Sequence, residues 1–181
     1  MTKINLYSQD YFSNAVDELR RLHYFEEPVI NASTKDTLDD SSRHILAYCS
    51  QNLIGAIRLT INSTQADEKA ATLTKAVIDR SWKRRELYKI LMLEIVVMAF
   101  EMGCDRAVAC VPLSIVIRNF LTSLGFEVVA EPTVLDNLRF DTTICEYIQL
   151  DLRRNIQKII HARNELVTRF QTKNYHIISH Y

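Results

Sequence analysis

Glycine and proline are scarce in this 181-residue chain, which has three prolines and only Gly55, Gly103 and Gly125. Glycine-rich phosphate cradles and flexible linkers both need more glycine than this. No low-complexity linker or internal repeat interrupts the chain before about residue 150. The sequence therefore predicts one domain over residues 1–150 and a C-terminal helical extension over residues 151–181.

Net charge and long apolar runs are also absent. Basic and acidic residues balance at 22 each, whereas a nucleic-acid-binding domain usually carries a basic excess. No apolar stretch reaches membrane-spanning length, and the first residues lack a signal-peptide core. The four cysteines fall singly, without a C-x-x-C pair. We therefore expect a cytoplasmic protein with buried thiols, no metal site and no nucleic-acid partner.

Apolar periodicity predicts a mixed α/β sheet. Residues 9–27 have helical spacing up to Pro28, and residues 43–62 form a hairpin about Ser50-Gln51-Asn52. Residues 71–79 form a third strand of similar character. A strand "RAVACV", a helix from Ser114 and the strands "FEVVAE" and "TTICEYIQLDL" follow. This order places a mainly antiparallel half beside a βαβ half.

Two further helices differ in character. Residues 84–102 are apolar on most faces, which predicts a buried helix with Gly103 as its left-handed cap. Glu94 falls inside that apolar stripe, and we expect it to be paired or angled toward solvent rather than functional. Residues 151–171 are amphipathic with a basic polar side. We expect this helix to pack on the domain or to form a homodimer, in preference to membrane contact.

The segment "SIVIRNFLTSLGFEVVAEP" (residues 114–132) follows one strand and leads into another. In that position it resembles the GNAT superfamily of acyl-CoA-dependent N-acyltransferases, in which a helix often ends in Leu-Gly-Phe before a strand. The resemblance covers about residues 10–150. It implies the GNAT fold, a mixed and mainly antiparallel sheet that is splayed at its centre and flanked by helices.

The N-terminal third is similar to one branch of that superfamily, through "RLHYF", "DTLDDSSRHILA" and "GAIRL". Acyl-homoserine-lactone synthases and long-chain N-acyl amino acid synthases show an arginine and an aromatic residue, then spaced acids, then a G-x-x-R-L strand. The resemblance implies catalytic roles for Asp39 and Arg58. It implies substrate contacts by Arg21, Phe25, Asp36, Thr72 and Thr74.

The sequence leaves open two interpretations of Asp36, Asp39 and Arg58. Asp36, Asp39 and Arg58 could bind the amine and carboxylate of an amino-acid-like acceptor, or they could form a structural ion pair. Lactone synthases place a glutamate and an arginine where Thr72 and Lys75 stand here. These differences favour N-acyl transfer in general over lactone formation.

A thioester cofactor would bind where the third strand meets the apolar helix. The usual family loop, Q/R-x-x-G-x-G/A, aligns with residues 83–88, so Glu86 and Tyr88 take the glycine positions. Three cations in a first helical turn oppose the helix dipole and favour an anion, although a solvated helix start is the alternative. The resemblance assigns cofactor contacts to Val77, Ile78, Lys83, Arg84, Arg85, Glu86, Leu87 and Tyr88.

Two proton-transfer groups complete the predicted site. "HYFEEPV" resembles the first-helix segment of arylalkylamine N-acetyltransferases, which implies that Glu27 is a general base; the alternative is a solvated helix end at Glu26 and Glu27. Leu121 stands four residues before Gly125, where many GNAT enzymes have a proton-donating tyrosine. Tyr147 or a water would then protonate the thiolate, unless it leaves unassisted.

The sequence thus predicts an N-acyltransferase that moves an acyl group from acyl-CoA or acyl carrier protein to the amine of a small amino-acid-like acceptor. The carrier protein is a predicted partner because the branch is usually supplied by one. The alternative is a degenerate domain that binds an acyl thioester or a protein without turnover.

Overall fold

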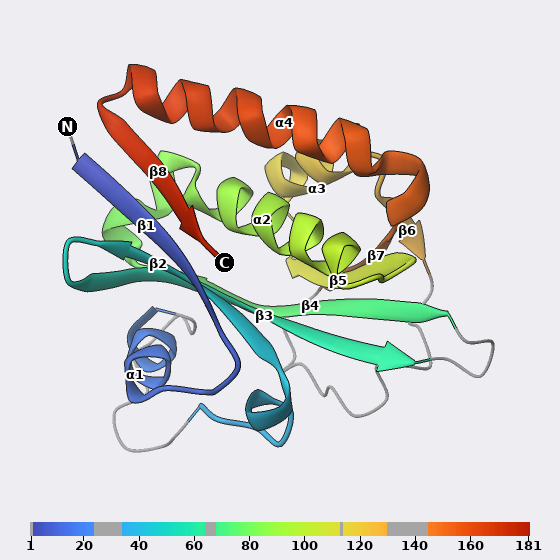
Figure 1. The fold of residues 1–181 in the computed structure, drawn as a ribbon, viewed down its shortest axis with the longest axis horizontal. Helices are drawn as coiled ribbons and strands as arrows, with labels where there is room; N and C mark the ends of the chain where they lie inside the picture. The colour runs from blue at the N-terminus through green and yellow to red at the C-terminus, as the bar shows by residue number, and fades with distance from the viewer. Residues whose placement is uncertain (1, 24–33, 64–67, 113, 130–144) are drawn as a thin grey trace.

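A computed structural model describes residues 2–23, 34–63, 68–112, 114–129 and 145–181 (Figure 1). Its strands are β1 (Thr2–Gln9), β2 (Arg43–Cys49), β3 (Asn52–Ser63), β4 (Lys69–Ile78), β5 (Arg106–Pro112), β6 (Glu127–Val129), β7 (Cys145–Asp151) and β8 (Tyr175–His180). Its α-helices are α1 (Asn14–His23), α2 (Leu87–Glu101), α3 (Ile115–Ser123) and α4 (Leu152–Thr172). Short 3₁₀ turns, η1 (Asp39–Ser41) and η2 (Arg80–Arg85), precede β2 and α2.

The strands form one sheet in the order β6-β7-β5-β4-β3-β2-β1-β8. Among the strand pairs of the described residues, β4–β5 and β1–β8 are parallel and the others antiparallel, so the predicted mixed and mainly antiparallel sheet is confirmed. Helices α2 and α4 lie over one face and α1 over the other (Figure 1).

The sheet is splayed at its centre, as expected. Pairing between β4 and β5 runs from Ala70↔Arg106 to Leu73↔Ala109, yet β4 continues to Ile78. Just past the last pair, β4 carries a bulge: Lys75 has φ +53°, and the register with β3 shifts there. A bulge bends its strand and increases its twist, so β4 turns away from β5 at this point.

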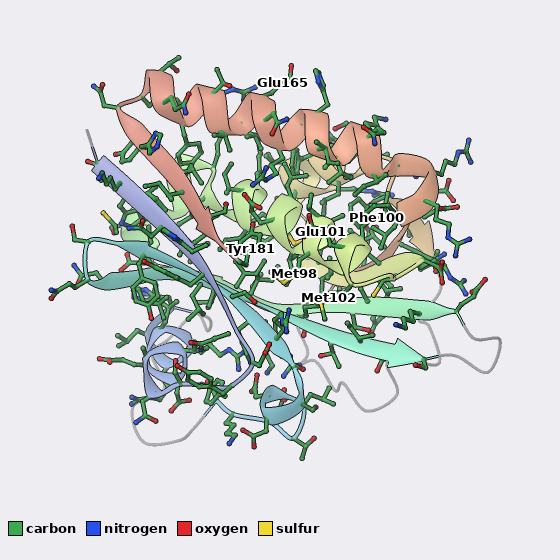
Figure 2. The ribbon with its side chains drawn as sticks, viewed as in Figure 1. Met98, Phe100, Glu101, Met102, Glu165 and Tyr181 are labelled. Carbon is green, nitrogen blue, oxygen red and sulfur yellow. The ribbon has the colours of Figure 1, made fainter. Side chains whose placement is uncertain are left out.

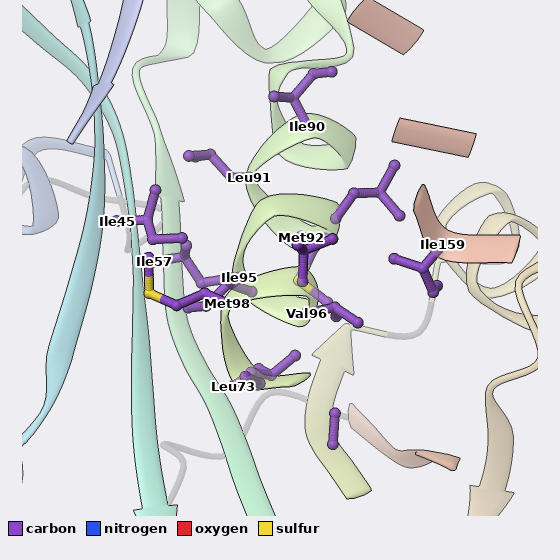
Figure 3. Close-up of a cluster of buried hydrophobic side chains, with 14 of the residues drawn as sticks. Ile45, Ile57, Leu73, Ile90, Leu91, Met92, Ile95, Val96, Met98 and Ile159 are labelled. Atoms are coloured by element: carbon purple, nitrogen blue, oxygen red, sulfur yellow. The ribbon is translucent and has the colours of Figure 1, made fainter. Parts of the chain in front are cut away.

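Helix α2 is the centre of the larger hydrophobic layer. Figure 3 shows Ile95 and Met98 of α2 facing Ile57 of the sheet, with Ile159 of α4 on the opposite side. The helix is buried on nearly all sides, as its sequence predicts, and Gly103 closes it with φ +80°. It begins at Leu87 rather than residue 84, because residues 80–85 form η2.

Glu94 lies in the middle of this apolar helix and is fully buried. Its carboxylate accepts a hydrogen bond from Tyr181 and lies 2.8 Å from Arg163 Nε. Tyr181 follows β8 and lies against α2 (Figure 2). The expectation of a paired carboxylate is confirmed, and the pair joins α2 to α4 and to the end of the chain.

The two outer strands at one edge differ from the prediction. The predicted helix over residues 9–27 is wrong at its start, because β1 occupies residues 2–9 and α1 begins at Asn14. Ile4 and Leu6 alternate on β1 and are fully buried. The predicted helical extension after residue 150 contains α4 but also β8, which pairs with β1 in parallel.

The hairpin turn is shorter than expected, since Asn52 already pairs with Cys49 and leaves Ser50 and Gln51 to make the turn. The apolar side of α4, including Ile156 and Phe170, is buried in the chain's own core. A homodimer through α4 would therefore have to use the polar side of that helix. No helix in the described ranges is long and apolar enough to cross a membrane.

Candidate functional site

A buried polar cluster lies on the face of the sheet that α1 covers. Arg58 of β3 pairs with Thr74 of β4 across the strands, and its Nε donates to Thr74 Oγ1 over 2.9 Å. Side chains alternate between faces along a strand, so Arg58 leaves the apolar layer under α2 and points to this opposite face. It is fully buried there.

Arg58 Nη1 donates to Asp36 Oδ1 over 2.5 Å and to Asp39 Oδ1 over 3.0 Å. Asp39 Oδ2 in turn accepts from Arg20 Nη1 over 2.8 Å and from the Asp36 backbone N–H over 3.0 Å. The predicted meeting of Asp36, Asp39 and Arg58 is therefore present, with Arg20 as a fourth member. Two guanidinium groups and two carboxylates balance each other's charge.

Asp39 is fully buried and remains ionised. Burial alone would raise the pKa of its carboxyl, but the hydrogen bond and charge of Arg20, the Asp36 N–H and the charge of Arg58 hold that pKa below its usual value. Both carboxylate oxygens already accept hydrogen bonds. Asp39 is thus placed to hold the two arginines rather than to transfer protons.

His44 closes the cluster from β2. Its Nε2–H donates to the Asp39 carbonyl over 3.1 Å, which leaves Nδ1 unprotonated. Burial lowers the pKa of the imidazole, so the ring is neutral in the folded protein. Acidification would protonate it preferentially in the unfolded chain and so weaken the fold.

The cluster reaches the surface at Asp36 and Lys75. The Asp36 side chain is 33% exposed, and its Oδ2 lies 3.7 Å from Lys75 Nζ, at the bulge of β4. Burial lowers the pKa of the Lys75 ammonium, although the charge of Asp36 opposes this effect. A carboxylate and an ammonium group therefore face outward beside the place where β4 separates from β5.

The first helix supplies a different arginine from the predicted one. Arg20 is buried and stacks over Phe12, whereas Arg21 lies 3.6 Å from Asp17 outside the cluster. The available sequence signal is that Arg20 follows Val16 by four residues, on the apolar side of α1. Phe25 and Glu27 lie outside the described residues.

Four of the predicted cofactor residues lie at the end of β4 (Val77 and Ile78) and at the start of α2 (Leu87 and Tyr88). Val77 and Ile78 pair with β3 on one side, and β5 does not reach them on the other. Leu87 is fully buried, so only its backbone could contact a ligand. Burial raises the pKa of Tyr88, which lies near Cys110 of β5.

The two threonines predicted to contact the substrate, Thr72 and Thr74, both lie on β4. Thr74 joins the buried polar cluster, while Thr72 Oγ1 accepts a hydrogen bond from Asn62.

Glu86 stands at the turn just before α2 with φ +60°, a left-handed conformation that glycine adopts at no steric cost. The geometry of the turn thus fits a glycine position, as the alignment predicts, although a glutamate occupies it. Its carboxylate accepts from Lys89 Nζ over 2.8 Å. The side chains of Lys83, Arg84 and Arg85 lie outside the described part of the chain.

Comparisons with known proteins agree with this geometry. Residues 4–126 match the model of a family described as the acetyltransferase (GNAT) family. No curated protein matches the chain in sequence.

Among solved structures, a candidate N-acetyltransferase from Lactobacillus plantarum has a TM-score of 0.64 at 19% identity, covering 83% of this chain and 99% of its own. An acyl-CoA N-acyltransferase from Pseudomonas aeruginosa has a TM-score of 0.61 at 14% identity, covering 81% and 98%. A Bacillus subtilis acetyltransferase in complex with CoA has a TM-score of 0.57 at 19% identity, covering 84% and 99%. At these identities the likeness shows the fold.

The substitution Asp39→Asn tests whether Asp39 holds the cluster together. It would leave Arg20 buried without its counter-ion and Arg58 paired with Asp36 alone, so we expect the free energy of unfolding to fall by about 3–5 kcal/mol. Urea denaturation measures this change. The neighbouring Asp40→Asn is the matched control, because Asp40 is exposed and lies outside the cluster, 2.7 Å from Lys35 Nζ. Equal stability of the two variants would contradict this role.

Proposed function

The chain belongs to the acetyltransferase (GNAT) family, and on this premise we propose that it acylates the amine of a small, amino-acid-like molecule. The acyl group would come from a thioester of coenzyme A or of an acyl carrier protein. The observation that carries the proposal is the splay: β4 runs on to Ile78 after its last pair with β5 at Leu73.

The splay supports a thioester donor for a geometric reason. Backbone groups of β4 beyond Leu73 face a gap in the ladder where β5 would otherwise bind them. A pantetheine arm carries amides in an extended chain, and it could pair with that edge as a strand would. The cofactor's phosphates would then lie toward the start of α2, where the first helical N–H groups have no helical partners. The Bacillus subtilis structure of similar fold contains CoA, which agrees with this donor.

Asp36 and Lys75 are the proposed binding site for the acceptor. The ammonium group of an amino acid would bind Asp36, and its carboxylate would bind Lys75. These two contacts would replace the 3.7 Å contact between the Asp36 and Lys75 side chains. Arg58 holds Asp36 in place through Nη1. Arg58 Nη2 is buried without a hydrogen-bond partner among the described residues, so it is a second donor that an acceptor oxygen could satisfy.

Acyl transfer needs a neutral amine, and Glu27 is the proposed base. A carboxylate that is partly buried beside the acceptor would have a raised pKa and could remove the ammonium proton, directly or through a water. This role rests on the resemblance of the sequence around Glu27 to arylalkylamine N-acetyltransferases.

The leaving thiolate needs a proton from elsewhere, because Leu121 has none to give and is buried in the core. Tyr147 lies opposite Cys110 in the β5–β7 register, one residue beyond the last β4–β5 pair. It is therefore our candidate donor, with water as the alternative. The lactone-synthase and N-acyl amino acid synthase branch remains the proposed subfamily, and it would admit a carrier protein as the donor.

A degenerate, binding-only domain is the second candidate. Glu86 in the glycine position and Leu121 in the tyrosine position favour it. Such a domain would bind a thioester and release no thiol.

Thiol release separates the two candidates. We expect the purified chain to release thiol from an acetyl-, octanoyl- or palmitoyl-thioester when amino acids and related amines are present. The rate should depend on the amine, and mass spectrometry should detect the N-acyl product. Measurable binding of CoA without release from any donor would favour the binding-only domain.

Glu27→Gln tests the proposed base. Loss of a general base typically lowers the rate by about 10²–10⁴-fold, so we expect kcat/KM to fall by at least about 100-fold at neutral pH. Glu26→Gln is the matched control, because it removes the same charge one residue earlier. Similar values of kcat/KM for the two variants would exclude Glu27 as the base.

A further inference from the structure

A second charged cluster surrounds Glu86, at the turn between η2 and the start of α2. Its carboxylate accepts a hydrogen bond from Lys89 Nζ over 2.8 Å. Arg169 Nη1 and Lys173 Nζ, from the end of α4, each lie 3.6 Å from the same carboxylate. Three cations thus surround one anion. Hydrogen bonding to Lys89 is the main cause that keeps the pKa of Glu86 below its usual value.

The C-terminal segment also packs against the turn that carries Glu86. Trp82 of η2 meets Tyr175 edge to face, with ring centroids 5.6 Å apart, and Tyr175 meets Phe170 of α4 in the same way at 6.0 Å. These aromatic contacts hold the end of α4 beside the start of α2. The positions of Arg169 and Lys173 near that helix start are therefore set by packing and not by charge alone.

We propose that Lys89, Arg169 and Lys173 form a phosphate-binding site, and that the Glu86 carboxylate occupies it until a ligand phosphate displaces it. This inference rests on the proposed function, because the ligand is the phosphate-bearing part of an acyl-thioester cofactor. It assigns to Arg169 and Lys173 a role in cofactor binding, although they lie beyond residues 4–126, which match the family model.

The charges favour exchange of the carboxylate for a phosphate. One carboxylate neutralises only one of the three cations, whereas the pyrophosphate of CoA and its 3′-phosphate each carry about −1.5 to −2 at neutral pH and offer several acceptor oxygens. Arg169 and Lys173 are 53% and 55% exposed, so they can follow a ligand without repacking the core. Lys89 also lies 5.1 Å from the Phe120 ring, which places the cluster between α2, α3 and α4.

Calorimetric titration with CoA tests the site in four proteins: wild type, Glu86→Gln, the double variant Arg169→Gln/Lys173→Gln, and the control Arg154→Gln/Lys158→Gln. The control removes two exposed cations from the same helix, at its other end. We expect the Arg169/Lys173 variant to bind CoA about tenfold more weakly, with a shallower salt dependence. Glu86→Gln should bind about threefold more tightly or better, since the competing carboxylate is lost. The control should match wild type.

Titration with 4′-phosphopantetheine identifies the phosphate. If the Arg169/Lys173 variant loses the same affinity for both ligands, the phosphate attached to pantetheine binds at the site. If it loses affinity for CoA alone, a phosphate of the nucleotide part binds there. Because Glu86→Gln and the Arg169/Lys173 variant are expected to shift affinity in opposite directions, general misfolding cannot produce the predicted pattern.

Equal CoA affinity of the Arg169/Lys173 variant and the control would overturn the phosphate site. So would unchanged or weaker binding by Glu86→Gln. If wild type still binds CoA and releases thiol in that case, the proposed function stands without this inference. Failure of wild type to bind either ligand would overturn both.

Discussion

The hydrogen-bonded ladder between β4 and β5 ends at Leu73↔Ala109, although both strands continue. The bulge at Lys75 follows two residues later and bends β4 away. This one break in the sheet leaves backbone groups for an extended ligand. It also brings the Lys75 ammonium beside Asp36 and directs the chain through η2 into the start of α2. The acceptor and cofactor sides of the proposed site therefore meet at a single backbone feature.

The charge clusters around Asp39 and Glu86 differ in burial. The one around Asp39 is buried except at Asp36 and is neutral overall, with Arg20 and Arg58 each bonded to the Asp39 carboxylate. It gives the acceptor side a rigid base. The one around Glu86 is partly exposed and has an excess of positive charge. A buried balanced cluster costs too much to rearrange on binding, whereas an exposed unbalanced one can exchange its anion.

Local patterns were sufficient to predict α2 and the β2–β3 hairpin, because apolar periodicity lies within short stretches. The central splay was implied by the resemblance to the GNAT family. Local patterns failed for β1 and β8, which pair with each other across almost the whole length of the chain. The same limit applies to the sites. Asp36, Asp39 and Arg58 were predictable from motifs, but the contact of Glu86 with the end of α4 depends on tertiary packing between distant segments.

Hydrogen–deuterium exchange of the β4 backbone, with and without saturating CoA, tests most directly whether the splay holds the cofactor. If the pantetheine arm pairs with β4 beyond Leu73, amides of residues 74–78 should exchange more slowly in the complex. Those of residues 70–73, already paired with β5, should change little. Saturating CoA that leaves exchange at residues 74–78 unchanged would contradict the account.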